Sequence, residues 1–138
     1  MRIDSYEDLE IWQLGMELLV EVYAVVEALP QHERFNLINQ MSRAAVSIPS
    51  NIAEGWGRGR SASQAHFIRV SRGSLYELAT QLEAARRIGY ISDSQAEPLR
   101  LRTIHLGKKI NAYLSWLEGS FVREEKSLYG DVQDEHAP

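Results

Sequence analysis

Apolar residues recur at three- and four-residue steps through four long segments of the sequence, which is the spacing of one face of a helix. No segment shows the alternation of apolar and polar residues that predicts a half-buried strand. The pattern therefore predicts an all-α fold. Four helices joined by short connections favour an antiparallel, up-down-up-down four-helix bundle, because a short loop returns the chain beside the helix it has just left.

The first two predicted helices are limited by prolines. The first closes at Pro30, and the second runs from about residue 33 to residue 54 with Pro49 inside it. Proline lacks an N–H and clashes with the carbonyl four residues earlier, so we expect a kink, or an end, near Ile48. The apolar stripes are Leu9, Trp12, Met16, Leu19, Tyr23 and Val26 in the first helix, and Leu37, Met41, Ala44 or Ala45, Ile48 and Ile52 in the second.

The last two predicted helices begin at capping boxes. Ser61 with Gln64, and Ser92 with Gln95, have the three-residue spacing of that motif. Gly89 is placed to end the third helix in the left-handed conformation. The apolar stripes are Phe67, Val70, Leu75, Leu78, Leu82 and Ala85 in the third helix, and Leu99, Leu101, Ile104, Leu106, Ile110, Tyr113, Leu114, Leu117 and Phe121 in the fourth.

The chain length of 138 residues is typical of a single domain. We expect residues 1–127 to form the bundle and the acidic residues 128–138 to form a disordered tail. The stripes are wide, and Trp12, Trp56 and Trp116 also need cover, so the apolar surface exceeds what one bundle can bury. We therefore expect the chain to assemble into a homo-oligomer.

Composition excludes several classes of protein. Apolar residues make up 44% and charged residues 25%, and the absence of cysteine excludes disulfide scaffolds, thiolate metal sites and cysteine nucleophiles. No stretch approaches the roughly 18 to 20 apolar residues of a membrane-spanning helix. The acidic N-terminal residues 1–8 lack the basic start and apolar run of a signal peptide. These features predict a cytoplasmic protein with no membrane partner.

Common catalytic motifs are missing from the sequence. No histidine follows a glutamate by three residues, two histidines never stand four residues apart, and there is no Gly-x-Ser-x-Gly elbow. The glycine-rich residues 55–60 do not form a dinucleotide-binding loop, because no strand precedes them and Arg60 holds the sixth position. We therefore expect no metal, no cofactor and no catalytic residue.

The formal net charge of −4 conceals an uneven distribution. Residues 1–33 carry one arginine against eight acidic residues, and residues 118–138 carry two basic residues against six acidic ones. Between them, residues 43–72 carry five arginines against Glu54 alone. The candidate contacts for nucleic acid or another anion are Arg58, Arg60, Arg69 and Arg72. The alternative is a set of differently solvated helix faces and, at residues 55–60, a flexible exposed turn.

Small and charged residues lie beside the apolar stripes of the second and third predicted helices. We interpret them as a partly buried polar layer that favours one helix register at some loss of stability. Arg43 would pair there with Glu77 or Glu54, and Asn51 and Ser74 would satisfy the remaining hydrogen bonds. A functional pocket at this place is the alternative. The full set is Arg43, Ser47, Asn51, Glu54, Gly73, Ser74 and Glu77.

Two runs of sequence carry a family resemblance. They are Arg-Ala-Ala-Val-Ser-Ile-Pro-Ser-Asn-Ile-Ala-Glu-Gly at residues 43–55 and Arg-Gly-Ser-Leu-Tyr-Glu-Leu at residues 72–78, followed by Ile-Gly-Tyr-Ile at residues 88–91. Leu9, Trp12, Gln40 and Arg58 fit the same pattern. Over about residues 6–118 the chain resembles the four-helix bundle proteins of the 23S rRNA intervening-sequence family.

The resemblance implies a four-helix protomer that assembles into a ring-like homopentamer with no established catalytic activity. A similar protein is the accessory factor of diversity-generating retroelements, which associates with a reverse transcriptase and with nucleic acid. This chain differs from such relatives in its overall acidity. Arg58 carries over as a loop residue. The positions that carry over as determinants of the fold are Arg43, Asn51, Glu54, Gly55, Gly73, Ser74 and Glu77.

Taken with the resemblance, the sequence predicts a non-enzymatic oligomeric scaffold or adaptor. Its expected partners are further copies of itself and RNA or an RNA-handling protein. The alternative is a purely structural homo-oligomer with no role in nucleic-acid binding.

Overall fold

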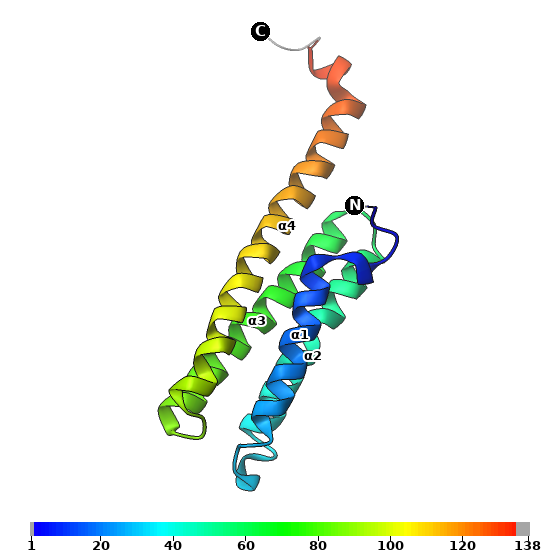
Figure 1. Cartoon of the computed structure of the whole chain (residues 1–138). Helices are drawn as coiled ribbons and strands as arrows, with labels where there is room; N and C mark the ends of the chain where they lie inside the picture. Colours follow the sequence, from blue (N-terminus) through cyan, green and yellow to red (C-terminus); the bar gives the residue numbers. More distant parts are fainter. Residues whose placement is uncertain (1, 135–138) are drawn as a thin grey trace.

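The computed structural model describes residues 2–134, with side chains described for residues 2–120. The chain forms four α-helices that lie side by side along one long direction (Figure 1). No strand occurs in residues 2–134, so the all-α prediction is confirmed. The elements are η1 (Tyr6–Asp8), α1 (Glu10–Val26), η2 (Gln31–Glu33), α2 (Leu37–Trp56), α3 (Ala62–Ile88) and α4 (Asp93–Asp134).

Local hydrogen bonds set the helix ends largely where the sequence predicts them. The Ser61 hydroxyl accepts from the Gln64 N–H at 3.2 Å, and Ser92 and Gln95 bond reciprocally at 3.1 and 2.8 Å. Gly89 ends α3 with a φ of +94°, in the left-handed region that glycine adopts without strain.

Each helix packs against two neighbours. The neighbouring pairs are α1 with α2, α2 with α3, α3 with α4, and α4 with α1, whereas the backbones of the diagonal pairs do not approach closely within the described part of the chain. The four helices therefore surround one shared core, and the side formed by α1 and α2 is opposite the side formed by α3 and α4. The largest fully buried side chains are Leu18, Met41, Ile48, Ile52, Ile68, Leu75, Leu78, Leu106, Ile110 and Leu117.

The buried face of α1 differs from the prediction. The core side of α1 holds Ile11, Gly15, Leu18, Val22 and Val26. Of the predicted stripe, Leu9, just before α1, and Val26 are buried as predicted, whereas Trp12, Met16 and Leu19 are half-buried and Tyr23 is exposed. Apolar residues occupy two adjacent flanks of this helix, and the three- and four-residue spacing fits both. Packing against α2 and α4 decides which flank enters the core.

Pro49 does not end α2, so the predicted helix end near Ile48 is wrong, and the alternative of a kink there stays a prediction. The helix is continuous from Leu37 to Trp56, and Pro49 is buried inside it. A Cβ built on Gly15 of α1 would lie 3.6 Å from the Pro49 Cβ and 3.4 Å from Ile48 Cγ2. The ring thus packs where α1 approaches α2 closely. This tertiary contact offsets the loss of one helical hydrogen bond.

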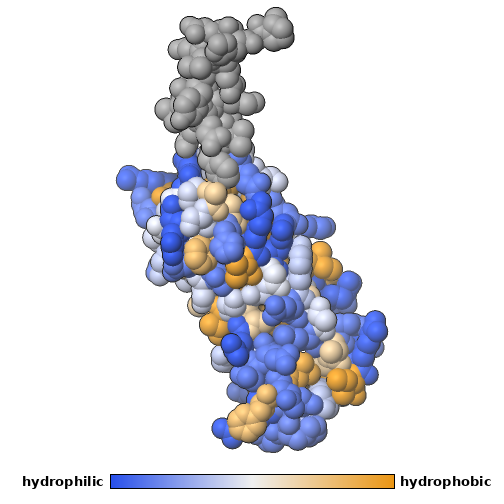
Figure 2. Space-filling view, turned by 180° about the vertical axis from the view of Figure 1, so that it is seen from behind, coloured by the Kyte–Doolittle hydropathy of each residue, from blue (hydrophilic) through white to orange (hydrophobic). Residues whose placement is uncertain are grey.

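The outer surfaces of α3 and α4 keep some residues that the stripes assign to the core. Val70, Leu101 and Ile104 are exposed, and Phe67 and Tyr113 are half-buried. Phe121 lies outside the residues whose side chains are described. Figure 2 shows one face of the molecule, where hydrophobic side chains form small separate groups among hydrophilic ones. The helices therefore carry apolar surface beyond what the core takes up.

Tyr90 ties together two connections at the lower end of the bundle in Figure 1. Tyr90 lies in the connection from α3 to α4. Its hydroxyl donates to Glu33 Oε1 at 3.0 Å and lies 3.1 Å from His32 Nε2, and both of these residues are in the α1–α2 connection. Glu33 also accepts from the Leu37 N–H through its other oxygen, at 3.2 Å. Burial, followed by the hydrogen bond to Glu33, raises the pKa of Tyr90 above its ordinary value.

The predicted boundary between a bundle at residues 1–127 and a disordered tail at residues 128–138 stays a prediction. The backbone of α4 is helical to Asp134, which is within the segment 128–138 assigned to a tail, and residues 135–138 lie outside the described residues. Within the described part of the chain, no helix combines the length and apolarity needed to span a bilayer.

Candidate functional site

The uncharged part of the predicted polar layer comes together between α2 and α3. Ser47 Oγ of α2 lies 2.7 Å from Ser74 Oγ of α3. The Asn51 amide donates to the Ser47 carbonyl at 2.8 Å and to Ser47 Oγ at 2.9 Å. Ser74 is buried, and the other two side chains are half-buried. These three residues fix how α2 and α3 lie against one another, because a slip would leave buried hydroxyl and amide groups without partners.

The charged part of that layer does not form as predicted. Arg43 and Glu77 are exposed and line a shallow hollow of about 350 Å³, but among the described residues no ion pair joins Arg43 to Glu77 or Glu54. Glu54 instead accepts from Arg58 Nη2 at 2.8 Å, one helical turn away. An exposed arginine keeps its hydration, so little is gained by holding it in a layer.

Ser71 is a member of the layer that the sequence analysis missed. It is fully buried on α3, and its hydroxyl donates to the Ile48 carbonyl of α2 at 2.8 Å. The signal available in the sequence is its position three residues before Ser74, on the same helix face.

We expect Arg43→Met to change the free energy of unfolding by no more than about 0.5 kcal/mol, which is the range of ordinary surface substitutions, because Arg43 is exposed. Ser71→Ala should lower the free energy of unfolding by about 1 kcal/mol, because the buried Ile48 carbonyl loses its donor. Urea denaturation followed by circular dichroism measures both. A large loss of stability for Arg43→Met would show that Arg43 does take part in a charged layer. An unchanged stability for Ser71→Ala would show that the Ser71 hydrogen bond does not stabilise the contact between α2 and α3.

The two predicted glycines of this region have different surroundings. A Cβ built on Gly55 would lie 3.1 Å from Phe67 Cβ and 3.2 Å from the Gln64 carbonyl, both in α3. Gly73 is exposed, and a Cβ there would meet nothing within 4 Å among the described residues. Only Gly55 is therefore needed for the close approach of α2 and α3.

The two predicted loop arginines, Arg58 and Arg60, bind on different sides of the α2–α3 connection. Besides its contact with Glu54, Arg58 places its guanidinium 4.9 Å from the Phe67 ring centre. The Arg60 guanidinium reaches α4, where it lies 5.5 Å from the ring centre of Trp116 and donates to Ser120 Oγ at 3.4 Å. Both guanidinium groups of this connection therefore lie against aromatic rings.

The other two predicted arginines lie on α3 and face α4. Arg69 forms an ion pair with Glu118, and Arg72 Nη1 donates to Asn111 Oδ1 at 3.0 Å. With Leu114 and Ser115 they line an open hollow of about 420 Å³. The four candidate arginines thus form two pairs of neighbours in sequence rather than one cluster.

An aromatic hollow beside Arg60 was not predicted. It measures about 890 Å³ and lies at the end of the bundle where the α2–α3 connection meets α4. At its wall, the buried Gln64 amide donates to the Gly59 carbonyl and accepts from the Tyr113 hydroxyl at 2.6 Å. Burial raises the pKa of Tyr113 above its ordinary value. The lining residues are Ile3, Leu9, Trp56, Gly57, Gly59, Arg60, Gln64, Tyr113 and Trp116.

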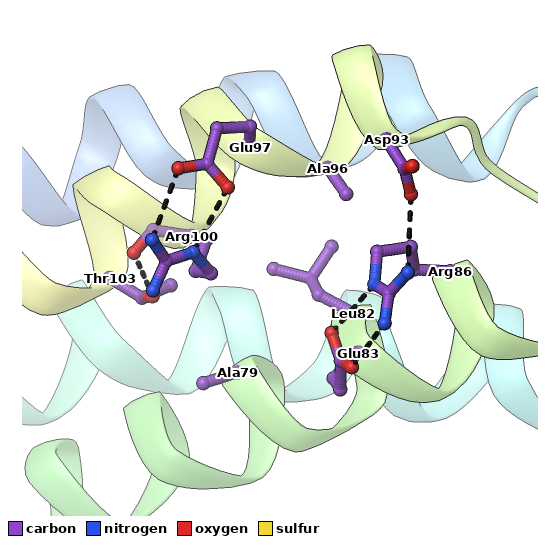
Figure 3. A pocket seen from close by; sticks show the side chains of 9 residues that line it. All are labelled: Ala79, Leu82, Glu83, Arg86, Asp93, Ala96, Glu97, Arg100 and Thr103. Atoms are coloured by element: carbon purple, nitrogen blue, oxygen red, sulfur yellow. Dashed lines mark hydrogen bonds and ion pairs between the residues drawn. The ribbon is translucent and has the colours of Figure 1, made fainter.

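A second hollow, of about 650 Å³, lies between α3 and α4 near their connection (Figure 3). Its floor is apolar, and charged side chains from both helices lie around it: Arg86 binds Glu83 and Asp93, and Arg100 binds Glu97. Hydrogen bonds from Arg86 and then Arg87 lower the pKa of Glu83 to about 2. Its carboxylate is therefore ionised at neutral pH.

The described residues hold no group of three histidine, aspartate or glutamate side chains that could bind a metal ion. The polar contact between α2 and α3 belongs to the packing of the bundle, whereas the arginines held on rings and carboxylates and the two hollows lie at its surface.

Three comparisons relate the chain to known proteins. Residues 7–112 match the sequence model of the family described as 23S rRNA-intervening sequence protein. No curated protein matches the sequence. A crystal structure of a protein of unknown function from the S23 ribosomal protein family of Bacteroides thetaiotaomicron has a similar fold, with a TM-score of 0.70 and 20% sequence identity over 75% of this chain and 97% of the other. The family match covers most of the sequence, so the chain belongs to the 23S rRNA-intervening sequence protein family.

Proposed function

We propose that this protein is a non-enzymatic, cytoplasmic scaffold that assembles from identical antiparallel four-helix protomers, as a homopentamer, and binds RNA. It needs no cofactor in this role. Membership of the 23S rRNA-intervening sequence family supports an RNA-related role. The apolar side chains left outside the core, among them Val20, Tyr23 and Leu101, support self-association.

The observation that carries the RNA proposal is the concentration of positive charge in α3, in the connection before it and in the part of α4 up to residue 120. Residues 57–120 carry ten basic and five acidic side chains, a formal charge of +5 in a chain whose net charge is −4. Phosphate binding responds to this local potential rather than to the total charge. The loop residues Arg58 and Arg60 are the proposed main contacts, and Arg69 and Arg72 are additional ones.

Aromatic rings beside these arginines favour single-stranded RNA. Trp116 lies against Arg60, and Phe67 lies against Arg58. Proteins that bind single strands combine cationic side chains with rings on which bases stack. A homo-oligomer would repeat this set of residues in each copy, which multiplies weak contacts into useful affinity.

The test measures binding of a fluorescently labelled single-stranded RNA at about 50 and 200 mM salt. If the oligomer makes about ten phosphate contacts, affinity should fall about 10⁴-fold over this range. Arg58→Glu with Arg60→Glu should nearly abolish binding. The matched control, Arg34→Glu with Arg87→Glu, makes the same charge change at exposed residues away from this connection and should keep most of it.

No detectable binding at about 50 mM salt would overturn the RNA proposal and leave the purely structural homo-oligomer. Equal losses in the two double variants would show that net charge matters and would remove Arg58 and Arg60 as specific contacts.

A further inference from the structure

The two halves of the bundle carry opposite charge. Residues 2–56, which contain α1 and α2, hold three basic and nine acidic side chains, a formal charge of −6. Residues 57–120, with α3 and the part of α4 up to residue 120, have a formal charge of +5. We call these the acidic half and the basic half. The α1–α2 side is opposite the α3–α4 side, so the two charges lie on opposite sides of one molecule.

Ion pairs between the two halves of one chain neutralise only part of their opposite charges. Glu17 and Glu21 bind Arg102 at 3.2 and 2.8 Å, and Glu10 binds Lys109 at 3.3 Å. Without these five residues the acidic half keeps three basic and six acidic side chains, or −3, and the basic half keeps eight basic and five acidic, or +3. Each molecule therefore presents an acidic side and a basic side to its surroundings.

The acidic half carries an apolar ridge on α1. We define the α1 ridge as Met16, Leu19, Val20 and Tyr23, of which Val20 is 66% exposed and Tyr23 is 47% exposed. The acidic residues of α1 that reach α4 occupy one flank of the helix, so the ridge faces outward and toward the α2 side. No lysine or arginine occurs in α1. The ridge is thus an uncovered apolar strip on the acidic half.

The basic half carries a matching groove. The hollow of Figure 3 continues into a second hollow of about 230 Å³, because Ala79 of α3 and Thr103 of α4 line both. We define the α3–α4 groove as these two joined hollows. Small or apolar residues line its length, and Tyr76 and Ile104 stand exposed at 53% and 42% in its upper part. The charged side chains that line it balance one another: they are Arg86, Arg100 and Lys108 with Glu83, Asp93 and Glu97. Neither Arg69 nor Arg72 is in it.

The ridge and the groove lie at the same height along the bundle. Arg102 of α4 binds Glu17 and Glu21 on either side of Val20 in sequence, and it directly precedes Thr103 of the groove. Copies related by an axis parallel to the helices would therefore bring the ridge of one to the level of the groove of the next. Attraction between the acidic and basic halves would favour this contact over a contact of either side with itself.

We infer that the α1 ridge of one copy docks into the α3–α4 groove of a second copy, so that protomers join head to tail. The inference rests on the proposed homo-oligomer and names the two surfaces that form it. When a ridge binds a groove, the resulting dimer still has one unoccupied ridge and one unoccupied groove. Further copies can therefore add, and all ridges and grooves are occupied only when the assembly closes into a ring. The loop arginines Arg58 and Arg60 lie outside both surfaces.

The test uses two variants that each lack one surface. The ridge variant carries Val20→Lys and Tyr23→Lys, and the groove variant carries Tyr76→Glu and Ile104→Glu, all at exposed positions that leave the core intact. Size-exclusion chromatography with light scattering should show a larger assembly for the unmodified protein and a monomer for each variant. An equimolar mixture of the two variants should give a dimer, because the intact ridge of one meets the intact groove of the other.

Three results would decide against the inference. Variants that assemble like the unmodified protein, or a mixture that remains monomeric while the unmodified protein assembles, would overturn the two named surfaces and leave the proposed oligomer standing. An unmodified protein that is monomeric at about 10 μM would overturn the proposed oligomer itself. The control Val70→Lys, at an exposed apolar residue of α3 outside the groove, should assemble normally, and its failure would show that any added charge prevents assembly.

Discussion

Gly55→Leu should lower the free energy of unfolding by about 3 kcal/mol, because α3 leaves no room for a side chain at this position. The first added atom alone would lie 3.1 Å from Phe67 Cβ and 3.2 Å from the Gln64 carbonyl. One of these neighbours is main chain, so relief requires α2 and α3 to move apart. That movement would also stretch the bond between Ser47 and Ser74, two turns away along α2.

Gly73→Leu is the matched control for this prediction. Gly73 also lies inside a helix, but it is exposed and has open space around it. Removing a glycine from an exposed helix interior should raise stability by up to about 1 kcal/mol. Urea denaturation of both variants measures the difference, and equal effects would show that the contact between α2 and α3 at Gly55 is not tight.

Gln64→Leu should lower the free energy of unfolding by about 1 to 2 kcal/mol, although it preserves the size of the side chain. The Gln64 amide is buried and joins two segments, because it donates to the Gly59 carbonyl and accepts from the Tyr113 hydroxyl. Leucine would remove both of these bonds, but Gly59 and Tyr113 line a hollow that water reaches, and the Gly59 carbonyl also accepts from the Ser61 hydroxyl. The loss therefore stays below the cost of leaving two buried groups without any partner, which is about 1 to 3 kcal/mol for each.

A double-mutant cycle separates this network from simple packing. Tyr113→Phe removes one of the two stranded groups and should cost about 1 kcal/mol by itself. In combination with Gln64→Leu, the loss should be clearly smaller than the sum of the single losses, because the hydroxyl that leucine strands is then absent. Strict additivity in thermal or urea unfolding would mean that Gln64 and Tyr113 do not act together.

The parts of the fold that depend on local sequence were predictable. Ser61, Gly89 and Ser92 set helix ends through bonds to residues at most four positions away, and the structure places those ends as predicted. The buried face of α1 was not predictable in the same way. Its two apolar flanks both have helical spacing, and only the positions of α2 and α4 decide which one is buried.

Pro49 shows the same limit. Its local preference is to end a helix, but a buried contact with Gly15 of α1 keeps it inside α2. No feature within a few residues of Pro49 contains that information.

The candidate site divides along the same line. Helical spacing was enough to bring Ser47, Asn51 and Ser74 to one contact between neighbouring helices. The predicted pairing of Arg43 did not form, because Glu54 binds Arg58, which follows α2 by two residues, and Arg43 and Glu77 are both exposed to solvent. The aromatic hollow takes residues from the N-terminal segment, the α2–α3 connection and α4, which no spacing rule connects.

The hydroxyl of Tyr90 gives one end of the bundle its own sensitivity to alkali. It donates a proton to Glu33, and the raised pKa means that the phenol holds this proton more strongly in the folded chain than in the unfolded one. This contribution to stability is complete below pH 10 and disappears as the pH rises through the raised pKa, where a phenolate would face a carboxylate. Strongly basic solution should therefore weaken the contact between the α1–α2 and α3–α4 connections.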